Sequence, residues 1–265
     1  MTVSKGERAA DPAARGVVVT GGASGIGRVI ARRFAEHGYR VHIFDIDEVA
    51  VDVALAENPA FGATVGDVSL AGDVARGMRD AIDGMERVDV LVNDAGIAGP
   101  RLPVEEMPAD EWDRTMKVNL YGPFLWIRQV VPGMKARREG SIVNISTGSV
   151  RTLPVNRSVY TVSKWGVEGL TKTVARELGP WNVRVNAIQP GMVNNERMRG
   201  IVERIADQEG RTAAEVEAEF LQFISMRCKV EPEDIADMAV FLSSEGARRV
   251  TGQVIAVDGH IEWEQ

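Results

Sequence analysis

A tyrosine and a lysine four positions apart, Tyr160 and Lys164, are the residues whose types and spacing most directly indicate chemistry. Side chains four residues apart share one face of a helix, so the lysine ammonium would sit beside the phenol. A nearby cation favours the phenolate and lowers a tyrosine pKa that starts near ~10. Such a tyrosine can act as an acid or base near neutral pH. Ordinary amphipathic helices also contain this spacing, so the pair needs support from the rest of the chain.

Hydroxyl side chains precede this pair at the end of an apolar run. Residues 142–145 have the composition of a buried strand, and Ser146, Thr147 and Ser149 follow it. A loop containing Pro154 then leads to the tyrosine. Hydroxyl side chains thus crowd the end of this strand, just before the tyrosine.

A glycine-rich turn near the start of the chain has the form of a phosphate-binding loop. Residues 16–20 form a β-branched strand, residues 21–27 (GGASGIG) follow at once, and a helical pattern then runs to Gly38. Glycines let the backbone approach a pyrophosphate, and the helix dipole favours its charge. The spacing Gly-x-x-x-Gly-x-Gly differs from the usual Gly-x-Gly-x-x-Gly, but the strand, loop and helix supply the required context.

An acidic residue, Asp45, closes the second predicted strand. It lies eighteen residues after Gly27, close to the ~20 expected for a carboxylate that binds the adenosine ribose. Such a carboxylate would repel a 2′-phosphate, and neither Ser24 nor Ile46 offers that phosphate a cation, so NAD is expected in preference to NADP. The alternative role for Asp45 is a helix cap, for which Asp47 is the better candidate.

Strands and helices alternate along the chain. The predicted strands are residues 16–20, 39–44, 62–68, 88–92, 142–145, 183–188 and 253–258, and helical patterns include 69–85 and 109–137. This alternation predicts an α/β fold with a parallel sheet covered on both faces. Because no linker, repeat or low-complexity tract interrupts it, we expect one domain over residues 15–265, preceded by a mobile extension at 1–14.

Composition limits the classes of function. The 265-residue chain has a net charge of −7 and a pI near 5.2, which argues against nucleic acid or an anionic membrane as main partner. No apolar run approaches the ~18 residues of a membrane span, and the first fourteen residues lack a signal peptide's apolar region. A single cysteine, Cys228, fits a reducing compartment, so we expect a cytoplasmic protein, and no metal site is predicted.

Taken together, the motifs resemble those of the short-chain dehydrogenase/reductase family in order and spacing. The resemblance covers residues 16–259 and rests on Thr20-Gly21-x-x-x-Gly25-x-Gly27, Asp67-Val68, Asn93-x-Ala95-Gly96, Asn119, Tyr160-x-x-x-Lys164 and Pro190-Gly191. It implies a single-domain, Rossmann-like, doubly wound sheet of about seven parallel strands. It also implies a nicotinamide cofactor and a homotetramer.

The resemblance also implies roles for individual residues. Tyr160 would be the catalytic acid/base, Lys164 would hold the nicotinamide ribose and lower the tyrosine pKa, and Asn119 would support a water in the proton relay. Thr147 occupies the position of the family's catalytic serine, whereas Ser146 should face the other side of the strand unless a bulge intervenes. The residues expected to line the cofactor are Gly21, Ser24, Gly25, Ile26, Gly27, Asp45, Ile46, Asp67, Val68, Asn93, Ala95, Gly96, Tyr160, Lys164, Pro190, Gly191, Val193 and Asn195.

Three further positions depart from the family pattern. Asp94 replaces the second asparagine of the usual Asn-Asn-Ala-Gly. Asn195 stands nearest to the place of the threonine that binds the carboxamide, and an asparagine side chain can still donate and accept hydrogen bonds. His260 follows Val-Asp-Gly where a second glycine is common, and we expect a surface or interface role for it.

A long segment, residues 194–230, corresponds to the family's lid over the substrate. Its Thr212-x-x-Glu215 sequence predicts a capping box at the start of a helix. The candidate substrate residues are Ser149, Arg151, Arg157 and Arg197. Convergent guanidinium groups would suit a carboxylate, sulfonate or phosphate, whereas the alternative is that these surface arginines never meet.

These motifs predict an NAD(H)-dependent oxidoreductase that interconverts a small secondary alcohol and a ketone by hydride transfer, with Tyr160 moving the hydroxyl proton. The alternative is a catalytically silent NAD(H)-binding sensor or scaffold protein, which would keep the loop at 21–27 and lose the chemistry. Asn119, Tyr160 and Lys164 speak against this alternative, and the change to Thr147 leaves it open.

Overall fold

Seven short strands form one fully parallel sheet in the computed structural model, which describes residues 15–261. The strands are β1 (Gly16–Thr20), β2 (Arg40–Asp45), β3 (Gly62–Val65), β4 (Val90–Asn93), β5 (Gly140–Ile145), β6 (Val183–Pro190) and β7 (Val254–Val257). Their order across the sheet is β3-β2-β1-β4-β5-β6-β7, with every neighbouring pair parallel. The predicted doubly wound, Rossmann-like fold is therefore confirmed. The extension predicted at 1–14 lies outside the described residues.

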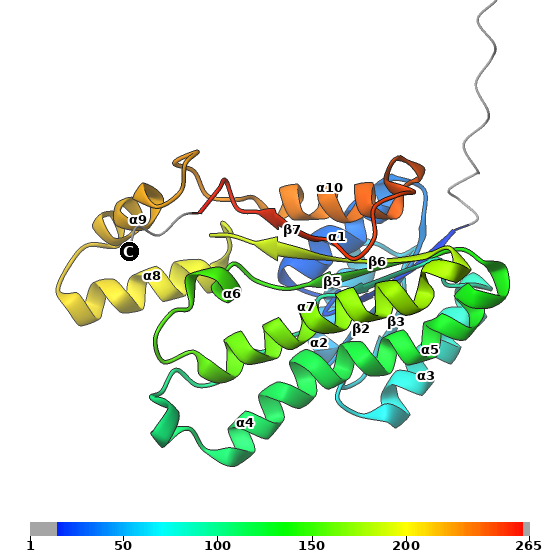
Figure 1. The fold of residues 1–265 in the computed structure, drawn as a ribbon, viewed down its shortest axis with the longest axis horizontal. Helices are drawn as coiled ribbons and strands as arrows, with labels where there is room; N and C mark the ends of the chain where they lie inside the picture. Colours follow the sequence, from blue (N-terminus) through cyan, green and yellow to red (C-terminus); the bar gives the residue numbers. More distant parts are fainter. Residues whose placement is uncertain (1–14, 262–265) are drawn as a thin grey trace, which may run out of the picture.

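Helices cover both faces of this sheet (Figure 1). One face carries α1 (Gly25–Glu36), α2 (Glu48–Glu57) and α10 (Pro232–Ser243), and the other carries α3 (Ala71–Met85), α5 (Gly122–Arg137) and α7 (Ser158–Leu178). The remaining helices are η2 (Val104–Glu106), α4 (Ala109–Met116), η3 (Lys117–Tyr121), α6 (Ser149–Thr152), η4 (Gly179–Trp181), α8 (Glu196–Glu209), α9 (Ala213–Gln222) and η5 (Glu245–Ala247). Within residues 15–261, no helix has both the length and the apolar character needed to cross a bilayer.

The apolar strands supply both core layers at once, because successive side chains of a strand point to opposite faces. In β1, Val17 and Val19 belong to one hydrophobic cluster, Val18 belongs to the other, and all three are fully buried. In β4, Leu91 likewise faces the layer opposite to Val90. This two-sided burial explains why the strands are continuous runs of apolar residues.

The direction in which the chain is wound reverses between β1 and β4, the point at which ligands bind in doubly wound sheets. The glycine loop, Asp45 and the hydroxyl residues after β5 all follow the carboxyl ends of their strands. They therefore meet along one edge of the sheet. In Figure 1 the strands point to the left, and α8 and α9 lie on that side, beyond this edge.

The predicted boundary between the third strand and the next helix was wrong, and the helical patterns at 109–137 are divided, in both cases for local reasons. The third strand ends at Val65, and α3 begins at Ala71, because the Asp67 carboxylate accepts the Ser69 N–H at 2.8 Å and forms a turn. The helical pattern at 109–137 is divided into α4, a π-helical turn (η3) and α5. Pro123 stands at the start of α5 and has no N–H to continue the regular hydrogen-bond ladder.

Residues 194–230 fold mainly as α8 and α9, and the sequence analysis had predicted only the second of these helices. The capping box is confirmed: the Glu215 N–H donates to Thr212 Oγ1 at 3.3 Å, and the Thr212 N–H donates to Glu215 Oε2 at 2.9 Å. The segment is held by its own small apolar cluster, which consists of Met192, Val202, Ala206, Val216 and Ile224.

Candidate active site

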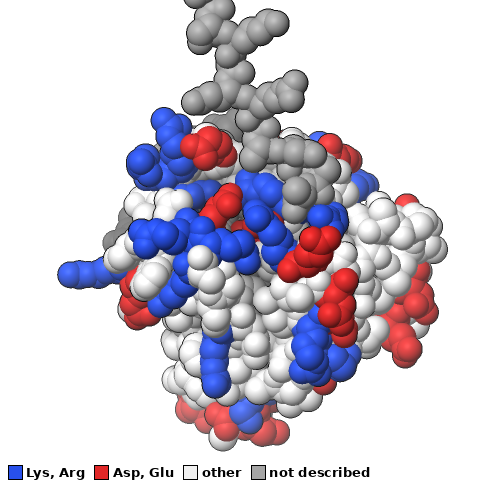
Figure 2. All heavy atoms as spheres, turned by 90° about the vertical axis from the view of Figure 1, so that its right-hand side faces the viewer, with Lys and Arg blue, Asp and Glu red and all other residues white. Residues whose placement is uncertain are grey.

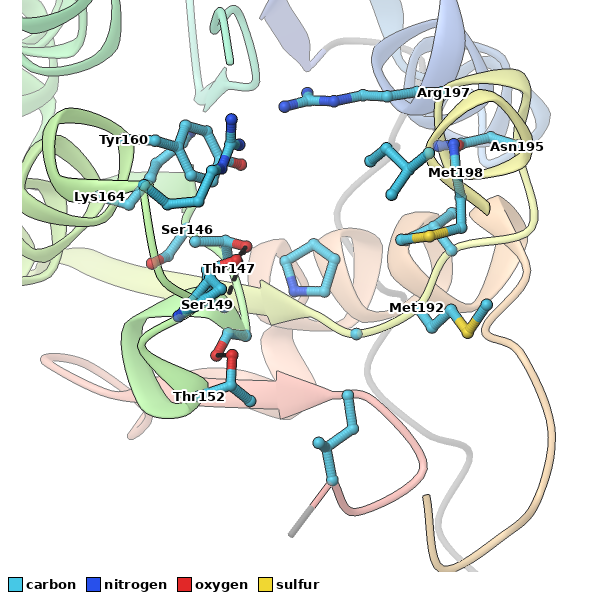
Figure 3. A pocket seen from close by; sticks show the side chains of 18 of the residues that line it. Ser146, Thr147, Ser149, Thr152, Tyr160, Lys164, Met192, Asn195, Arg197 and Met198 are labelled. Carbon is cyan, nitrogen blue, oxygen red and sulfur yellow. Dashed lines mark hydrogen bonds between the residues drawn. The ribbon is translucent and has the colours of Figure 1, made fainter. Parts of the chain in front are cut away.

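Tyr160 and Lys164 lie side by side on the face of α7 that turns toward a pocket (Figure 3). The two residues are only 8% and 5% exposed, respectively. Lys164 Nζ donates a hydrogen bond of 2.7 Å to the backbone carbonyl of Ile145, at the end of β5. This bond fixes the ammonium group beside the phenol. The predicted juxtaposition is therefore present.

Charges around Tyr160 outweigh the effect of its burial. Burial by itself would raise the tyrosine pKa, but the ammonium of Lys164 and the guanidinium of Arg197 lower it. A hydrogen bond from Thr147 and the charge of Arg157 lower it further, so the Tyr160 pKa falls below its ordinary value of 10.0. A phenol with a lowered pKa is suited to exchange a proton with a bound alcohol.

The two adjacent hydroxyl residues after β5 have different surroundings. Ser146 Oγ donates to Glu168 Oε1 at 2.6 Å, and Gln189 Nε2 donates to the same oxygen at 2.7 Å. The Ser146 hydroxyl is thus engaged by its neighbours. Both residues line the pocket, but of the two it is Thr147 that forms the hydrogen bond affecting Tyr160, and its Oγ1 lies 3.4 Å from Ser149 Oγ. The alternation along the strand predicts this difference.

Asn119 lies in the π-helical turn and is fully buried. Its Oδ1 accepts the Ile97 N–H at 2.8 Å, and its Nδ2 donates to the Ile97 carbonyl at 2.9 Å and to Ser163 Oγ at 3.0 Å. The side chain thus ties the segment after β4 to α7, beside the tyrosine and lysine. Single π-helical turns are frequent at functional sites.

A cleft of about 1160 Å³ runs along the carboxyl edge of the sheet, large enough for a dinucleotide. The expected cofactor residues that line it are Gly21, Ser24, Gly25, Ile26, Asp45, Ile46, Asp67, Val68, Ala95, Gly96 and Asn195. Those that line the adjoining pocket are Tyr160, Lys164, Pro190, Gly191 and Val193. The cleft and the pocket share Ile26, Asp94, Gly96, Asn195 and Arg197, so a ligand in one can contact a ligand in the other.

Two of the expected cofactor residues support the cleft without lining it. Asn93 is buried and donates through Nδ2 to Asn144 Oδ1 at 2.8 Å, so it joins β4 to β5 and does not reach the cleft. Gly27 packs against the loop itself, and a Cβ at this position would collide with the carbonyl oxygen of Gly21. Both positions determine the shape of the cleft from behind it.

The glycine loop fits a pyrophosphate. Gly21 has a φ of +65°, and a Cβ there would approach the Ala95 backbone to 3.0 Å, so a larger residue would strain the turn. Gly25 opens α1 and has free space where a Cβ would stand. The Ser24 side chain makes no capping hydrogen bond. Ser24 therefore occupies none of the N–H groups of the first helical turn. The Gly27 N–H donates to the Asp94 carboxyl group, and those of Gly25 and Ile26 face the cleft end of the helix, where an anion can bind.

Asp45 is held at the cleft by two backbone hydrogen bonds. The Ala23 N–H donates to Oδ2 at 3.1 Å, and the Asp47 N–H donates to Oδ1 at 3.2 Å. These bonds leave further acceptor capacity for the hydroxyls of a ribose. The alternative of Asp45 as a helix cap is wrong, because Asp47 caps α2 by accepting the Ala50 N–H at 3.0 Å.

Asp94 is the acidic residue shared by the cleft and the pocket, and no role had been predicted for it. Burial raises the pKa of its carboxyl group to about 6, although Lys164 and the Gly27 N–H both act to lower it. The group therefore takes up a proton at a higher pH than an ordinary aspartate, although it is still mostly ionised at neutral pH. It is the only carboxylate among the described residues that line the pocket.

The adjoining pocket, of about 400 Å³, has a polar end and apolar walls. Thr147, Tyr160 and Ser149 form the polar end. The walls come largely from α8, α9 and the segments around them, namely Met192, Met198, Ile201, Ile205, Phe220, Phe223 and Ile224. Figure 3 shows Arg197 and Met198 extending from α8 toward the tyrosine side. The pocket can hold a small, mainly apolar molecule beside the phenol.

Of the three arginines proposed for the substrate, the structure brings two to the pocket. Arg157 and Arg197 line it, but Arg151 does not. Arg151 Nη2 donates to Asp258 Oδ2 at 2.7 Å and to the Ile261 carbonyl at 2.8 Å, because the short helix α6 turns this side chain toward the segment after β7. Arg101, which follows β4, also lines the pocket, although it was not predicted as a site residue. No local motif marks that position.

Comparisons with known proteins agree with this geometry. A family model described as enoyl-(acyl carrier protein) reductase matches residues 21–260. Trans-4-hydroxycyclohexanecarboxylate dehydrogenase of Sinomonas cyclohexanicum is 35% identical over 253 residues, which cover 91% of this chain and 90% of that protein.

Two solved structures have the same fold along almost their whole length. A variant of actinorhodin polyketide ketoreductase with NADPH superposes with a TM-score of 0.87 at 31% identity, covering 92% of this chain and 96% of that one. NAD+-bound xylitol dehydrogenase superposes with a TM-score of 0.86 at 27% identity, covering 93% and 98%. The chain is therefore an oxidoreductase and belongs to the short-chain dehydrogenase/reductase family.

Proposed function

We propose that the protein is an NAD(H)-dependent oxidoreductase that interconverts a small secondary alcohol and a ketone. The single observation that carries this proposal is the buried tyrosine, Tyr160, whose pKa is lowered by Lys164 beside a pocket that opens into a dinucleotide-sized cleft. The named relatives support it, because a hydroxy acid dehydrogenase, a polyol dehydrogenase and a ketoreductase all act on an alcohol or carbonyl group.

In oxidation, the Tyr160 phenolate takes the hydroxyl proton of the substrate, and Lys164 stabilises that phenolate. Thr147 donates a hydrogen bond to the substrate oxygen as charge develops on it. In reduction, the phenol returns the proton to the same oxygen. When the cofactor is bound, the start of α1 would hold its pyrophosphate, Asp45 its adenosine ribose and Lys164 its nicotinamide ribose. The nicotinamide would supply the position that accepts or donates the hydride.

Turnover with a substrate panel tests this proposal. The panel contains cyclic alcohols, hydroxycyclohexanecarboxylates, polyols and the matching ketones, with NAD(H) and NADP(H), and the absorbance of the reduced nicotinamide is followed. Turnover in either direction is expected for at least one pair. Tight cofactor binding without any turnover across the panel would favour the silent sensor or scaffold.

The rate of oxidation is expected to rise with pH. Oxidation requires the phenolate, and the Tyr160 pKa lies below 10.0, so kcat for oxidation increases as pH rises through that lowered pKa and then levels off. Reduction requires the phenol, so its rate falls over the same interval. Initial rates in both directions across the pH range provide the measurement, and a rate of oxidation that falls with pH would contradict the assignment.

Asp45→Ala is expected to relax the preference for NAD. In the native chain, the carboxylate accepts hydrogen bonds from the ribose and repels a 2′-phosphate, so NAD should give the higher kcat/KM. Its removal should lower the ratio of kcat/KM for NAD to that for NADP about tenfold or more, the effect of one interaction of ~1.4 kcal/mol. Steady-state rates with both cofactors measure this ratio.

Asp47→Ala is the matched control for this substitution. Asp47 caps α2 two residues further along and does not line the cleft. Loss of the cap should lower thermal stability slightly and leave the cofactor ratio unchanged. A native chain that uses NADP as well as NAD would refute the role given to Asp45.

A further inference from the structure

Three guanidinium groups converge on one wall of the pocket. Arg157 Cζ lies 4.4 Å from the centroid of the Tyr160 ring, and Arg197 Cζ lies 5.6 Å from the same centroid. Arg101 lines the pocket with them, and the charges of Arg101 and Arg197 both act on Arg157. The three residues come from the loop after β4, the loop before α7 and the first turn of α8, so tertiary structure alone brings them together. Figure 3 shows Arg197 reaching from α8 toward the tyrosine.

These cations form no close ion pair with an acidic residue among residues 15–261. None of the three takes part in an ion pair there, and Arg157 donates only to the backbone carbonyl of Ala98, at 3.1 Å. Asp94 is the only carboxylate lining the pocket in the described part of the chain, and it faces three arginines and Lys164. One carboxylate cannot balance these four cations, so the pocket lining carries a net positive charge.

Arginines at the opposite end of the sheet provide a contrast. Figure 2 shows blue and red side chains mixed at the end where β1 begins. There Arg87 Nη2 lies 2.6 Å from Asp89 Oδ1, and Arg40 Nη1 lies 3.5 Å from Glu86 Oε1. Basic residues on that face are balanced by acids of the chain itself. In the pocket, by contrast, Arg101, Arg157 and Arg197 face an apolar cavity without a close ion pair.

Holding these cations close together is unfavourable. Burial lowers the pKa of Arg157, and the charges of Arg197 and Arg101 lower it further. An anion in the pocket would relieve this repulsion and accept hydrogen bonds from the guanidinium groups. The planar fork of an arginine side chain matches a carboxylate especially well.

We propose that the substrate is a small hydroxy carboxylate, with a compact apolar body between its carbinol and its carboxylate. This inference rests on the proposed oxidoreductase function. Arg157 and Arg197 bind the carboxylate, and Arg101 adds positive charge to the same wall. The carbinol reaches Tyr160 and Thr147, while the apolar body packs against side chains such as Met198 and Phe220. A pocket of about 400 Å³ has room for a body of at least roughly the size of a single ring.

A bound carboxylate should also change the pKa of Tyr160. Lys164, Arg157 and Arg197 face the phenol, and Asp94 acts on Lys164 and Arg197. A bound carboxylate neutralises the two arginines and so raises the phenol pKa in the complex. The pKa from the kcat profile should then exceed the pKa from the kcat/KM profile for a hydroxy carboxylate. A neutral alcohol should show a smaller difference.

Equilibrium binding tests the site without any turnover. Cyclohexanecarboxylate and cyclohexanecarboxamide have nearly the same shape, and calorimetry with the NAD-loaded protein compares their affinities. The carboxylate is expected to bind about tenfold or more tightly, since hydrogen bonds to charged groups contribute more than neutral ones. Arg157→Gln and Arg197→Gln should each remove most of this preference and change carboxamide binding less than about twofold.

Arg204→Gln is the matched control. Arg204 belongs to α8 like Arg197 and its charge acts on Arg157, but it does not line the pocket. The Arg204→Gln variant should keep the full preference for the carboxylate over the carboxamide. Arg197→Lys should keep part of that preference. Thermal unfolding of each variant verifies that the fold persists.

Two results would overturn the inference. One is equal binding of the carboxylate and the carboxamide by the native protein. The other is an equal loss of turnover for neutral and anionic alcohols in the arginine variants, which would limit Arg157 and Arg197 to lowering the Tyr160 pKa. If instead the proposed oxidoreductase function is wrong, the protein would still bind the carboxylate selectively but would turn over no alcohol or ketone of the panel.

Discussion

Tyr160→Phe is expected to reduce kcat for alcohol oxidation by about 10²-fold or more, within the range for a general acid/base. The substitution removes one oxygen and leaves the ring, which packs against the guanidinium groups of Arg157 and Arg197. The pocket should therefore keep its shape while losing the group that moves the proton. Binding of NADH, followed by its fluorescence, should survive because the cleft is untouched.

Tyr121→Phe is a control of the same chemical kind. Tyr121 is 45% exposed and stacks on Phe124, with ring centroids 5.6 Å apart, outside both the cleft and the pocket. It should retain native kcat. If Tyr160→Phe also retained nearly native turnover, another group would have to move the proton, and the proposed mechanism would be wrong.

Features that depend on local geometry could be predicted from the sequence. β1 was predicted at its observed bounds, because a β-branched run is followed directly by glycines. The placement of Tyr160 beside Lys164 required only the four-residue spacing of a helix. The separation of Ser146 from Thr147 required only the alternation of a strand. In each case, neighbouring residues in the chain settle the result.

Features that depend on distant segments could not be predicted. Arg101, Arg157 and Arg197 meet only because three connections end at the same edge of the sheet. The same limitation made Arg151 a wrong candidate, since its partner Asp258 lies 107 residues away. Asn93 was placed at the cofactor from the motif, but pairing of β4 with β5 brings it to Asn144.

Substitution of Thr147 should separate its hydroxyl group from its shape. Thr147→Val keeps the branched side chain and removes the hydroxyl, so kcat should fall by roughly 10²-fold or more, the scale for one donor to a developing oxyanion. Thr147→Ser keeps the donor and should remain active, and the lost methyl group should admit bulkier alcohols. Steady-state rates for the variants with a common substrate give the comparison.

Ser146→Ala decides which of the two adjacent hydroxyls serves the substrate. Ser146 Oγ donates to Glu168 Oε1 at 2.6 Å, in a network shared with Gln189, so its loss should reduce stability rather than turnover. A large loss of kcat in Ser146→Ala together with a small loss in Thr147→Val would transfer the role to Ser146. If both variants kept native turnover, the substrate oxygen would have to be held by another donor, and Ser149, 3.4 Å from Thr147 Oγ1, is the nearest hydroxyl to test next.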